Sequence, residues 1–468
     1  MQPCYKGGLS VDRQELTALM ETQKQFFLQG HTRTASARIH ALTKLIQAIE
    51  QYEHEISDAL KRDLHKSETE AYITEIGFVL MEARHTIKSL KRWMKPKRVK
   101  TPITHFGSRS RIMPEPYGTT LIIAPWNYPF QLAVAPLIGA LAAGNTAIIK
   151  PSEWAPHTSA LLAKLITSVF PREHVAVVEG AVEESEALLK LPFDYIFFTG
   201  STAIGKKVMQ AAAEQLIPLT LELGGKSPCI VHHDADLALA AKRIAFGKWT
   251  NAGQTCIAPD YIYVHESMKD ALEHELRKAV TQFYGEVPLE ADHYPSIISD
   301  RHYQRLTAFL QEGTVAWGGQ CDSERRRIAP TLLTDMNWQH AIMQEEIFGP
   351  LMPVLTYTSM EEVIQAVQAH PKPLALYLFT KEHALQQEVL SRVSFGGGCV
   401  NDTLMHIASP YLPFGGVGES GLGSYHGKAS FDAFSHHKSV LFQTNRFDLA
   451  LRYPGVKNAL KWMKKVMK

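Results

Sequence analysis

The chain has 468 residues, 45% of them hydrophobic, and is too long for one hydrophobic core, because single cores stop growing near about 250–300 residues. Its 49 lysines and arginines nearly balance 47 acidic residues, so the net charge gives no support to nucleic-acid binding. Five scattered cysteines exclude a disulfide framework and a zinc-binding pattern. Residues 1–12 contain no signal-peptide segment, and no apolar run reaches the roughly 18 residues of a membrane span. We therefore expect a cytoplasmic protein, where scattered free cysteines stay reduced. The length predicts at least two domains, and the cysteine pattern predicts no metal site.

Residues up to about 90 are predicted to be helical. Apolar residues recur there at steps of three and four, the spacing of one helix face, at Ile39, Leu42, Leu45, Ile46, Ile49, Ile56 and Leu60. Residues 88–111 follow with nine basic side chains, no acidic one, and the helix breakers Pro96 and Pro102. We expect this stretch to be an extended connector that forms a solvated arm or a subunit contact. A patch for an anionic ligand is the alternative.

From Tyr117 onward, short apolar runs alternate with helical stretches. The expected strands are 120–124, 146–149, 175–178 and 195–198, and the helices between them are 130–143, 157–170 and 203–215. Such alternation is typical of parallel βαβ units. Because open parallel sheets bind ligands at the carboxyl ends of their strands, residues 125–127, 150–153 and 199–201 are candidate ligand contacts.

A second alternating set begins after Gly225, which places a domain boundary at 223–226. Its expected strands are 229–231, 261–264, 351–355 and 374–379, and its expected helices are 236–249, 268–283, 301–311, 360–369 and 384–392. The chain ends in a basic amphipathic stretch, 453–468. Its apolar residues are Val456, Leu460, Met463 and Met467, and its lysines are Lys457, Lys461, Lys464, Lys465 and Lys468.

A glycine-rich turn, residues 199–207, follows one expected strand and opens a helix. Its G-x-x-x-x-G-K spacing lacks the final Ser or Thr of a phosphate-binding P-loop, because Lys207 stands where a hydroxyl would hold magnesium. It does not match G-x-G-x-x-G either. Gly200 and Gly205 still permit close backbone approach, and a helix N-terminus offers N–H groups to a phosphate. A plain strand-to-helix turn is the alternative.

Cys256 and Glu222 are the candidates for covalent chemistry. Cys256 follows Asn251, Gly253, Gln254 and Thr255, residues suited to a functional loop, and a reacting cysteine needs an accessible sulfur and a proton acceptor. Glu222 interrupts the apolar run 219–223 at a strand end, where a carboxylate is costly unless hydrogen-bonded or needed. A structural origin for both residues is the alternative.

The other cysteines are expected to be inert or peripheral. Cys229 and Cys399 lie in apolar runs typical of core thiols, and Cys4 and Cys321 lie in polar, exposed segments.

Two further segments offer groups suited to an active site. Asn127 follows a strand, and its amide can donate a hydrogen bond to an oxyanion; an Asx-turn before Pro129 is the alternative. Residues 344–350 offer a carboxylate for ribose hydroxyls and an aromatic side chain for a ring; a solvated acidic pair before a turn is the alternative.

In order along the chain, these segments resemble the aldehyde dehydrogenase superfamily. The matching motifs are Pro125-Trp126-Asn127-Tyr128-Pro129, Lys150-Pro151-Ser152-Glu153, Phe198-Thr199-Gly200-Ser201, Leu221-Glu222-Leu223-Gly224-Gly225-Lys226, Gly253-Gln254-Thr255-Cys256, Glu345-Glu346-Ile347-Phe348-Gly349-Pro350 and Pro413-Phe414-Gly415-Gly416. The resemblance extends from about Ser10 to Gln443. The short N-terminus and residues 413–428 resemble the class 3 branch, the fatty and aromatic aldehyde enzymes.

The resemblance implies an activity and a role for each matching residue. The activity is NAD(P)+-dependent oxidation of an aldehyde to a carboxylic acid, with Cys256 as nucleophile, Asn127 and the Cys256 N–H as oxyanion donors, and Glu222 as the base that activates water. The implied cofactor contacts are Trp126, Lys150, Glu153, Gly200, Ser201, Gly205, Glu346 and Phe348. Lys150 and Glu153 would meet the adenosine ribose, and residues 200–205 the pyrophosphate.

The resemblance also implies an α/β fold with a Rossmann-type cofactor domain, an α/β catalytic domain and a small bridging or oligomerisation element. The implied boundaries are 1–95 and 116–223 for the NAD(P)-binding domain, 224–424 for the catalytic domain, and 96–115 with 425–468 for the bridging arm and basic tail. Class 3 members look like homodimers. The membrane-bound ones end in a hydrophobic anchor, whereas the lysine-rich tail here suits peripheral contact with an anionic membrane, or else a solvated or docked helix.

We expect NAD+ to be preferred, because Glu153 accepts bonds from a 2′-hydroxyl but repels a 2′-phosphate, with some use of NADP+. Trp126, Tyr128, Trp249 and the loop near His406 are expected to form an apolar pocket for medium or long aliphatic or aromatic aldehydes. Three other functions stay open: a CoA-acylating relative, which Glu222 argues against; a P-loop nucleotide hydrolase; and a non-catalytic membrane-surface protein.

Overall fold

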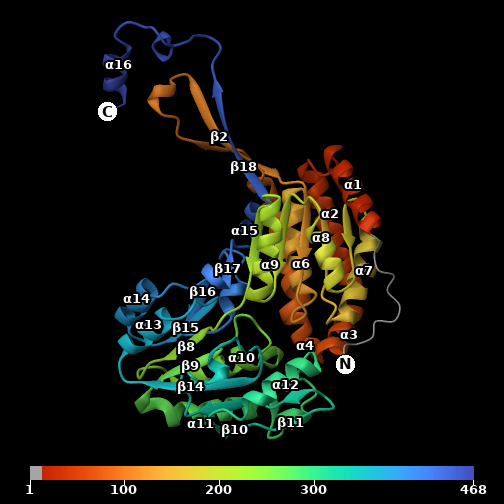
Figure 1. Ribbon diagram of the computed structural model, residues 1–468, viewed down its shortest axis with the longest axis vertical. Helices are drawn as coiled ribbons and strands as arrows, with labels where there is room; N and C mark the ends of the chain where they lie inside the picture. Colours follow the sequence, from red (N-terminus) through yellow and green to blue (C-terminus); the bar gives the residue numbers. More distant parts are fainter. Residues whose placement is uncertain (1–12, 468) are drawn as a thin grey trace.

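Two mostly parallel β-sheets organise the chain, and a long antiparallel arm projects away from them (Figure 1). This computed structural model describes residues 13–467. Among these residues, no helix combines the length and the apolarity that crossing a membrane requires.

The first sheet has the strand order β17-β7-β6-β3-β4-β5. Its strands are β3 (Thr119–Ile123), β4 (Thr146–Lys150), β5 (Val175–Val177), β6 (Tyr195–Thr199), β7 (Leu219–Glu222) and β17 (Gly421–Leu422). All neighbours run parallel except β17, which joins β7 antiparallel. The four strands expected between residues 120 and 198 are confirmed. They are apolar on both faces because helices cover both sides of a parallel sheet.

Helices alternate with these strands or lie around the sheet (Figure 1). They are α1 (Arg13–Leu28), α2 (Ala35–Gln51), α3 (Glu53–Leu64), α4 (Glu68–Ala71), α5 (Gly77–Trp93), α6 (Gln131–Ala143), α7 (Pro156–Val169), α8 (Val182–Leu189), α9 (Thr202–Glu214) and α15 (Lys428–Ala433). Every residue of α6 is buried, which fits a helix that is apolar all round.

The second sheet has the order β10-β13-β14-β9-β8-β15-β16 and is parallel except for β10. Its strands are β8 (Pro228–Val231), β9 (Tyr261–His265), β10 (Thr314–Trp317), β13 (Thr331–Thr334), β14 (Leu351–Tyr357), β15 (Ala375–Phe379) and β16 (Gly397–Val400), and a hairpin of β11 (Cys321–Asp322) and β12 (Arg327–Ile328) lies outside it. The helices are α10 (Leu237–Trp249), α11 (Lys269–Tyr284), α12 (Asp300–Phe309), α13 (Met360–Gln368) and α14 (His383–Arg392). The expected strands and helices of this half are confirmed.

The projecting arm joins distant parts of the sequence. It consists of β1 (Lys97–Val99), β2 (Ser108–Pro116) and β18 (Ser435–Gln443), and α16 (Ala459–Val466) lies at its far end (Figure 1). The expected extended connector is therefore confirmed for residues 97–111. It is wrong for residues 88–93, which complete α5, because Leu90 and Trp93 are buried on the inner face of that helix.

A π-helix interrupts the helical N-terminal region. η1 (Tyr72–Ile76) lies between α4 and α5, and Gly77 donates its N–H to the Tyr72 carbonyl five residues back. Single π turns of this kind often occur at functional sites.

Candidate active site

The carboxyl edge of the first sheet meets two loops of the second half. Asn127, just after β3, donates from Nδ2 to the carbonyl of Gln254 over 3.0 Å. Trp126 contacts Phe348 edge to face, with ring centroids 5.3 Å apart. The loops that precede β9 and β14 therefore lie against the strand ends where ligands bind in open parallel sheets.

Residues 250–260, between α10 and β9, form the loop that carries Cys256, named the cysteine loop. Its backbone conformation is unusual. Asn251 and Ala252 have φ of 53° and 50°, and Gly253 has φ of 75°. A Cβ on Gly253 would lie 2.2 Å from the Gly349 carbonyl oxygen, so the position requires glycine. Left-handed non-glycine residues cost free energy and persist only where surrounding contacts fix them, which happens often at active sites.

Cys256 itself is half-buried. Burial raises the pKa of its thiol, and the nearby carboxyl groups of Glu346 and Glu222 raise it further. Hydrogen bonds from the backbone N–H groups of Cys256 and Ile257 act in the opposite direction. The thiol is therefore protonated at neutral pH unless a proton acceptor or a positive charge approaches, since the thiolate is the nucleophilic form.

Glu222 is the last residue of β7, and its carboxyl group is almost fully buried, with 2% of the residue exposed. Neither carboxyl oxygen has a hydrogen-bond partner among the described residues. Burial raises the pKa of this carboxyl group well above its usual range. An unpaired buried carboxylate is costly for folding, and a carboxylate with a raised pKa is a stronger base.

Asn127 is 3% exposed, and both its side chain and its backbone carbonyl bond the cysteine loop. Its side chain bonds the Gln254 carbonyl, and its own carbonyl oxygen accepts from Asn251 Nδ2 over 2.8 Å. An amide nitrogen carries two hydrogens, so one of them remains for a substrate oxygen. These bonds exceed what an Asx-turn needs.

The remaining cysteines differ from Cys256. Cys229 is buried in β8, and burial raises the pKa of its thiol, as expected for an inert core position. Cys321 is exposed, as predicted, and Cys4 lies outside the described residues. Cys399 was expected in the core, but it is half-buried, and its sulfur lies 3.5 Å from His406 Nδ1.

The first group of expected cofactor contacts lies along the same sheet edge. Lys150 ends β4, is 2% exposed, donates to the Pro151 carbonyl over 2.7 Å, and lies 3.7 Å from Glu153. Ser201 precedes α9 without capping it, so the first N–H groups of α9 receive no bond from that hydroxyl. A helix N-terminus of this kind suits a phosphate.

Close backbone approach occurs at both glycines of the predicted turn. A Cβ on Gly200 would lie 2.6 Å from the Phe198 ring, and one on Gly205 would lie 2.5 Å from Leu223. Either addition would require the turn at the start of α9 or the neighbouring side chain to shift.

Glu346 and Phe348 form the opposite wall. Glu346 Oε1 has no partner among the described residues, and burial raises the pKa of this carboxyl group to about 8. Phe348 adopts φ of 51°. An unpartnered buried oxygen and a strained aromatic beside the cysteine loop fit a site that binds a polar ligand with a ring. Among residues 13–467, no group of three or more His, Cys, Asp or Glu side chains is placed to hold a metal ion.

The expected apolar pocket needs one correction. Trp249 is fully buried in the core, where its Nε1 donates to the Pro350 carbonyl over 2.8 Å and its ring packs on Trp317. Tyr425 is also fully buried, and burial raises the pKa of its hydroxyl, with the nearby Glu222 and Cys256 raising it further. α10, which precedes the cysteine loop, places Trp249 in the core because the apolar face of this helix packs inward.

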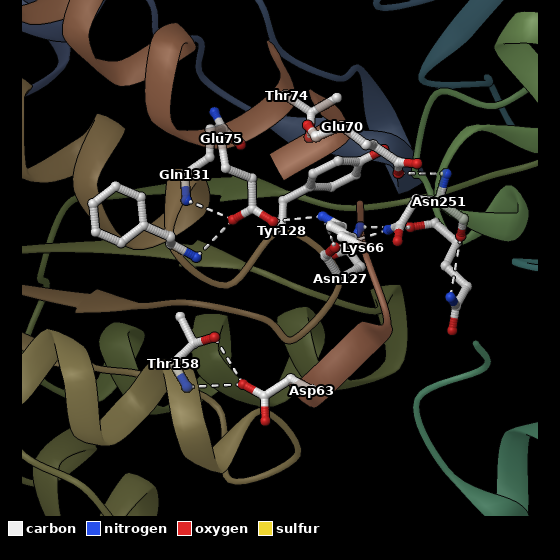
Figure 2. Close-up of polar contacts among 12 residues, drawn as sticks. Asp63, Lys66, Glu70, Thr74, Glu75, Asn127, Tyr128, Gln131, Thr158 and Asn251 are labelled. Atoms are coloured by element: carbon white, nitrogen blue, oxygen red, sulfur yellow. Dashed lines mark hydrogen bonds and ion pairs between the residues drawn. The ribbon is translucent and has the colours of Figure 1, made fainter. Parts of the chain in front are cut away.

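Three polar residues near the site were missed by the sequence reasoning. Lys66, Glu70 and Glu75 converge on Asn127 and Asn251 (Figure 2). Their motif is a run of charged residues, which in a sequence is usually a solvated helix surface. The spacing of five between Glu70 and Glu75 matches no face of an α-helix, and only the π turn explains it.

Comparison with known proteins places these features in a family. Residues 10–440 match the profile of the Aldehyde dehydrogenase family. The chain is 51% identical to 4,4'-diaponeurosporen-aldehyde dehydrogenase of Staphylococcus aureus, over 95% of this chain and 97% of that protein. It is 44% identical to aldehyde dehydrogenase family 3 member H1 of Arabidopsis thaliana, over 94% and 92%.

Two further similarities concern assembly and fold. A protein of Canis lupus familiaris named aldehyde dehydrogenase, dimeric NADP-preferring, is 44% identical over 94% of this chain and 98% of its own. The solved structure of Staphylococcus aureus AldH in a substrate-bound state superimposes with a TM-score of 0.95 and 50% identity, covering 97% of this chain and 99% of that one.

Proposed function

The chain belongs to the aldehyde dehydrogenase family, whose members oxidise aldehydes to carboxylic acids, and from this premise we propose that Cys256, Asn127 and Glu222 carry out that reaction here. The observation that carries the proposal is the bond from Asn127 to the Gln254 carbonyl, which joins a strand end of the first sheet to the cysteine loop. The unpartnered Glu222 carboxyl group near the same sulfur supports it.

In the first step the Cys256 sulfur attacks the aldehyde carbon and forms a thiohemiacetal. The carbonyl oxygen gains negative charge, which the free Asn127 N–H and the Cys256 backbone N–H stabilise. One such donor contributes about 2.7–4 kcal/mol to lowering a barrier. The thiol must lose its proton before it attacks, since the thiolate is the nucleophilic form.

In the second half of the reaction Glu222 acts on water. When bound, a nicotinamide cofactor supplies the acceptor for the hydride that leaves the thiohemiacetal carbon, and Cys256 then carries a thioester. Glu222 takes a proton from a water molecule, which attacks the thioester carbon and releases the acid and the thiol. Burial raises the pKa of Glu222, which makes its carboxylate a stronger proton acceptor.

The proposed cofactor is NAD+, with NADP+ possible. Lys150, Glu153, Gly200, Ser201, Gly205, Trp126, Glu346 and Phe348 would hold it. The fit rests on the unpartnered Glu346 oxygen, the uncapped start of α9 and the Lys150–Glu153 pair. Glu153 favours a free 2′-hydroxyl, whereas the canine relative's name indicates NADP preference in that protein.

The proposed substrate is an apolar aldehyde, medium to long and aliphatic, or aromatic. Tyr425 lies near Cys256 and belongs to an aromatic cluster. Its ring lies 5.8 Å from that of Phe414, which lies 5.9 Å from that of His406, measured between ring centroids. The name of the Staphylococcus aureus relative, 4,4'-diaponeurosporen-aldehyde dehydrogenase, also specifies an aldehyde for that protein.

The test is NADH formation by the purified protein with NAD+ and an aldehyde series from acetaldehyde to decanal and benzaldehyde, beside Cys256→Ala. We expect turnover that rises with chain length and is absent from the variant. Turnover in Cys256→Ala would refute the proposed nucleophile. Acyl-CoA formation that depends on added CoA would refute hydrolysis as the final step.

We propose that two copies associate through the arm. β18 pairs with β2 on one side, and the arm exposes Phe442, Leu441 and Phe106, a set of apolar side chains that an isolated chain would leave in water. A relative named as dimeric supports this assembly. Light scattering of the full-length protein checks it, and a monomer at micromolar concentration would contradict it.

We also propose that the arm and tail contact an anionic membrane surface. Residues 95–116 and 435–468 contain 14 lysines and arginines but only two acidic residues. The whole chain has 49 basic and 47 acidic residues, so the remaining residues include 35 basic and 45 acidic ones, and the positive charge is concentrated in the arm and tail. Leu460 and Trp462 of α16 are 68% and 54% exposed. Apolar side chains beside lysines favour a lipid interface, and each nearby Lys or Arg adds about 1 kcal/mol of attraction.

Co-sedimentation with phosphatidylserine vesicles tests the membrane contact. The full-length protein is expected to pellet at low salt and the protein lacking residues 453–468 to pellet less. Equal, salt-insensitive partitioning of the two would contradict it.

The free thiols of Cys229, Cys256, Cys321 and Cys399 support a reducing, cytoplasmic location.

A further inference from the structure

We infer that Lys66 and Glu75 are positioning residues for the oxyanion donor Asn127, acting through a buried ion pair that no step of the reaction uses directly. The inference rests on the proposed role of Asn127. Both side chains have no exposed surface, and Lys66 Nζ lies 2.5 Å from Glu75 Oε1 (Figure 2).

The Lys66–Glu75 ion pair connects the Asn127 backbone to the start of α6. Glu75 Oε2 accepts the N–H groups of Phe130 and Gln131, over 2.9 Å and 3.1 Å, at the start of α6. Lys66 Nζ donates over 3.0 Å to the Asn127 carbonyl and lies 3.9 Å from the centre of the Tyr128 ring. One ion pair therefore fixes the segment between β3 and α6 both at Asn127, in its middle, and at its junction with α6.

The same contacts extend to the cysteine loop. Asn251 Nδ2 shares the Asn127 carbonyl with Lys66 and also donates to the Gln254 carbonyl over 3.1 Å. The Asn251 N–H donates to Glu70 over 2.9 Å, which holds the left-handed turn before Gly253. The Tyr128 hydroxyl lies 2.6 Å from the hydroxyl of Thr255, next to Cys256.

These bonds determine how the Asn127 amide can point. The backbone carbonyl of Asn127 accepts from two donors, Lys66 and Asn251. One hydrogen of the side-chain Nδ2 is fixed on the Gln254 carbonyl, which leaves the other hydrogen in one direction. A donor works on an oxyanion only when held at the right place before the charge forms. Burying an ion pair is otherwise a poor source of stability, because desolvation offsets the attraction.

The test uses the double variant Lys66→Met/Glu75→Gln, which removes both charges and keeps the shapes. Glutamine still accepts the N–H groups at the start of α6. We expect kcat for aldehyde oxidation to fall by roughly 10- to 100-fold, the range for a slightly misplaced catalytic group. Cofactor-free hydrolysis of p-nitrophenyl acetate, in which Cys256 attacks an ester carbonyl and an oxyanion also forms, is expected to fall in parallel.

A third readout separates positioning from a general structural effect. Alkylation of Cys256 by iodoacetamide displaces iodide and forms no oxyanion, so its rate is expected to be unchanged in the double variant. An unchanged kcat would overturn the inference, and so would a fall in alkylation that matches the fall in kcat.

Matched controls exist elsewhere in the same half. Asp63 caps the start of α7 through His157 and Thr158, as Glu75 caps α6, and Arg38 is a buried cation bonded to the Thr32 and Ala142 carbonyls. Asp63→Asn and Arg38→Met are expected to lower the unfolding temperature and to leave kcat unchanged. A comparable loss of kcat in either control would also overturn the inference.

Two further variants keep the inference testable. If the double variant does not fold, Lys66→Met alone removes the bond to the Asn127 carbonyl while Glu75 still accepts the N–H groups at the start of α6, and an unchanged esterase rate in it would overturn the role of Lys66. Asn127→Ala tests the underlying function. If that variant keeps full rates, the proposed oxyanion role fails. If it is slow while the double variant is not, only the inference fails.

Discussion

Replacing Glu222 by glutamine is expected to make the protein more stable and less active at once. The carboxyl group is buried without a hydrogen-bond partner, and burial raises its pKa well above the ordinary 4.5. A folded state that keeps this proton loses stability as the pH rises above the pKa of the unfolded chain, because the unfolded chain releases the proton and the folded chain does not. Glutamine cannot ionise in either state.

The size of the effect follows from linkage. The penalty grows by about 1.4 kcal/mol for each pH unit above the unfolded pKa until the folded pKa is reached. The variant should therefore melt at the wild-type temperature near pH 4.5 and above it at pH 8. Its kcat should fall by about 10²–10⁴, the usual contribution of a general base.

The step that fails can be observed directly. Hydride transfer precedes hydrolysis, so Glu222→Gln with excess NAD+ and aldehyde should give a burst of about one NADH per active site, followed by slow turnover. Glu82→Gln is the matched control, since Glu82 is also buried with its pKa raised to about 7 and bonds the Gly427 N–H. That variant should show the pH-dependent gain in stability and keep its kcat. Wild-type steady-state turnover in Glu222→Gln would refute the reasoning.

Three further predictions concern the loop, the thiol and the cofactor. Gly253→Ala should cost about 1–3 kcal/mol, because its Cβ would meet the Gly349 carbonyl at 2.2 Å with φ of 75°; a thermal midpoint equal to wild type would contradict this. Alkylation of Cys256 in the cofactor-free protein should still accelerate above pH 9, since burial raises its pKa, and Glu346→Gln should speed it at pH 8; a plateau near pH 8.5 would argue against this. Glu153→Gln should shift the kcat/KM ratio about tenfold toward NADP+ by removing a charge that repels the 2′-phosphate, and an unchanged ratio would remove Glu153 from the ribose site.

The alternation of strands and helices could be predicted because it depends on local patterns. Buried parallel strands such as β3 and β4 are short and apolar on both faces, and helices between them keep a regular apolar spacing. The strand ends then indicated which loops face a ligand, and Asn127 and Glu222 do lie there.

Features that depend on distant partners could not be predicted. Residues 88–93 looked like part of a basic connector, but Trp93 is anchored in a core that includes Phe431. Lys66 and Glu75 were not singled out from the sequence, because their partners, Asn127 and the start of α6, lie more than fifty residues away in the chain. No local pattern marks a lysine that bonds an acid across a π turn and a remote carbonyl.

The order in which the chain is made gives the edge strand β17 a further consequence. Gly421 pairs with Glu222, and Leu422 with Leu221, so the strand that ends in the proposed base stays an open sheet edge until almost the whole chain exists. At about 5–20 residues per second, the ribosome reaches Gly421 roughly 10–40 s after Glu222. A nascent or prematurely terminated chain thus contains Cys256 but not the completed strand pair beside it, so a fragment is not expected to consume aldehydes.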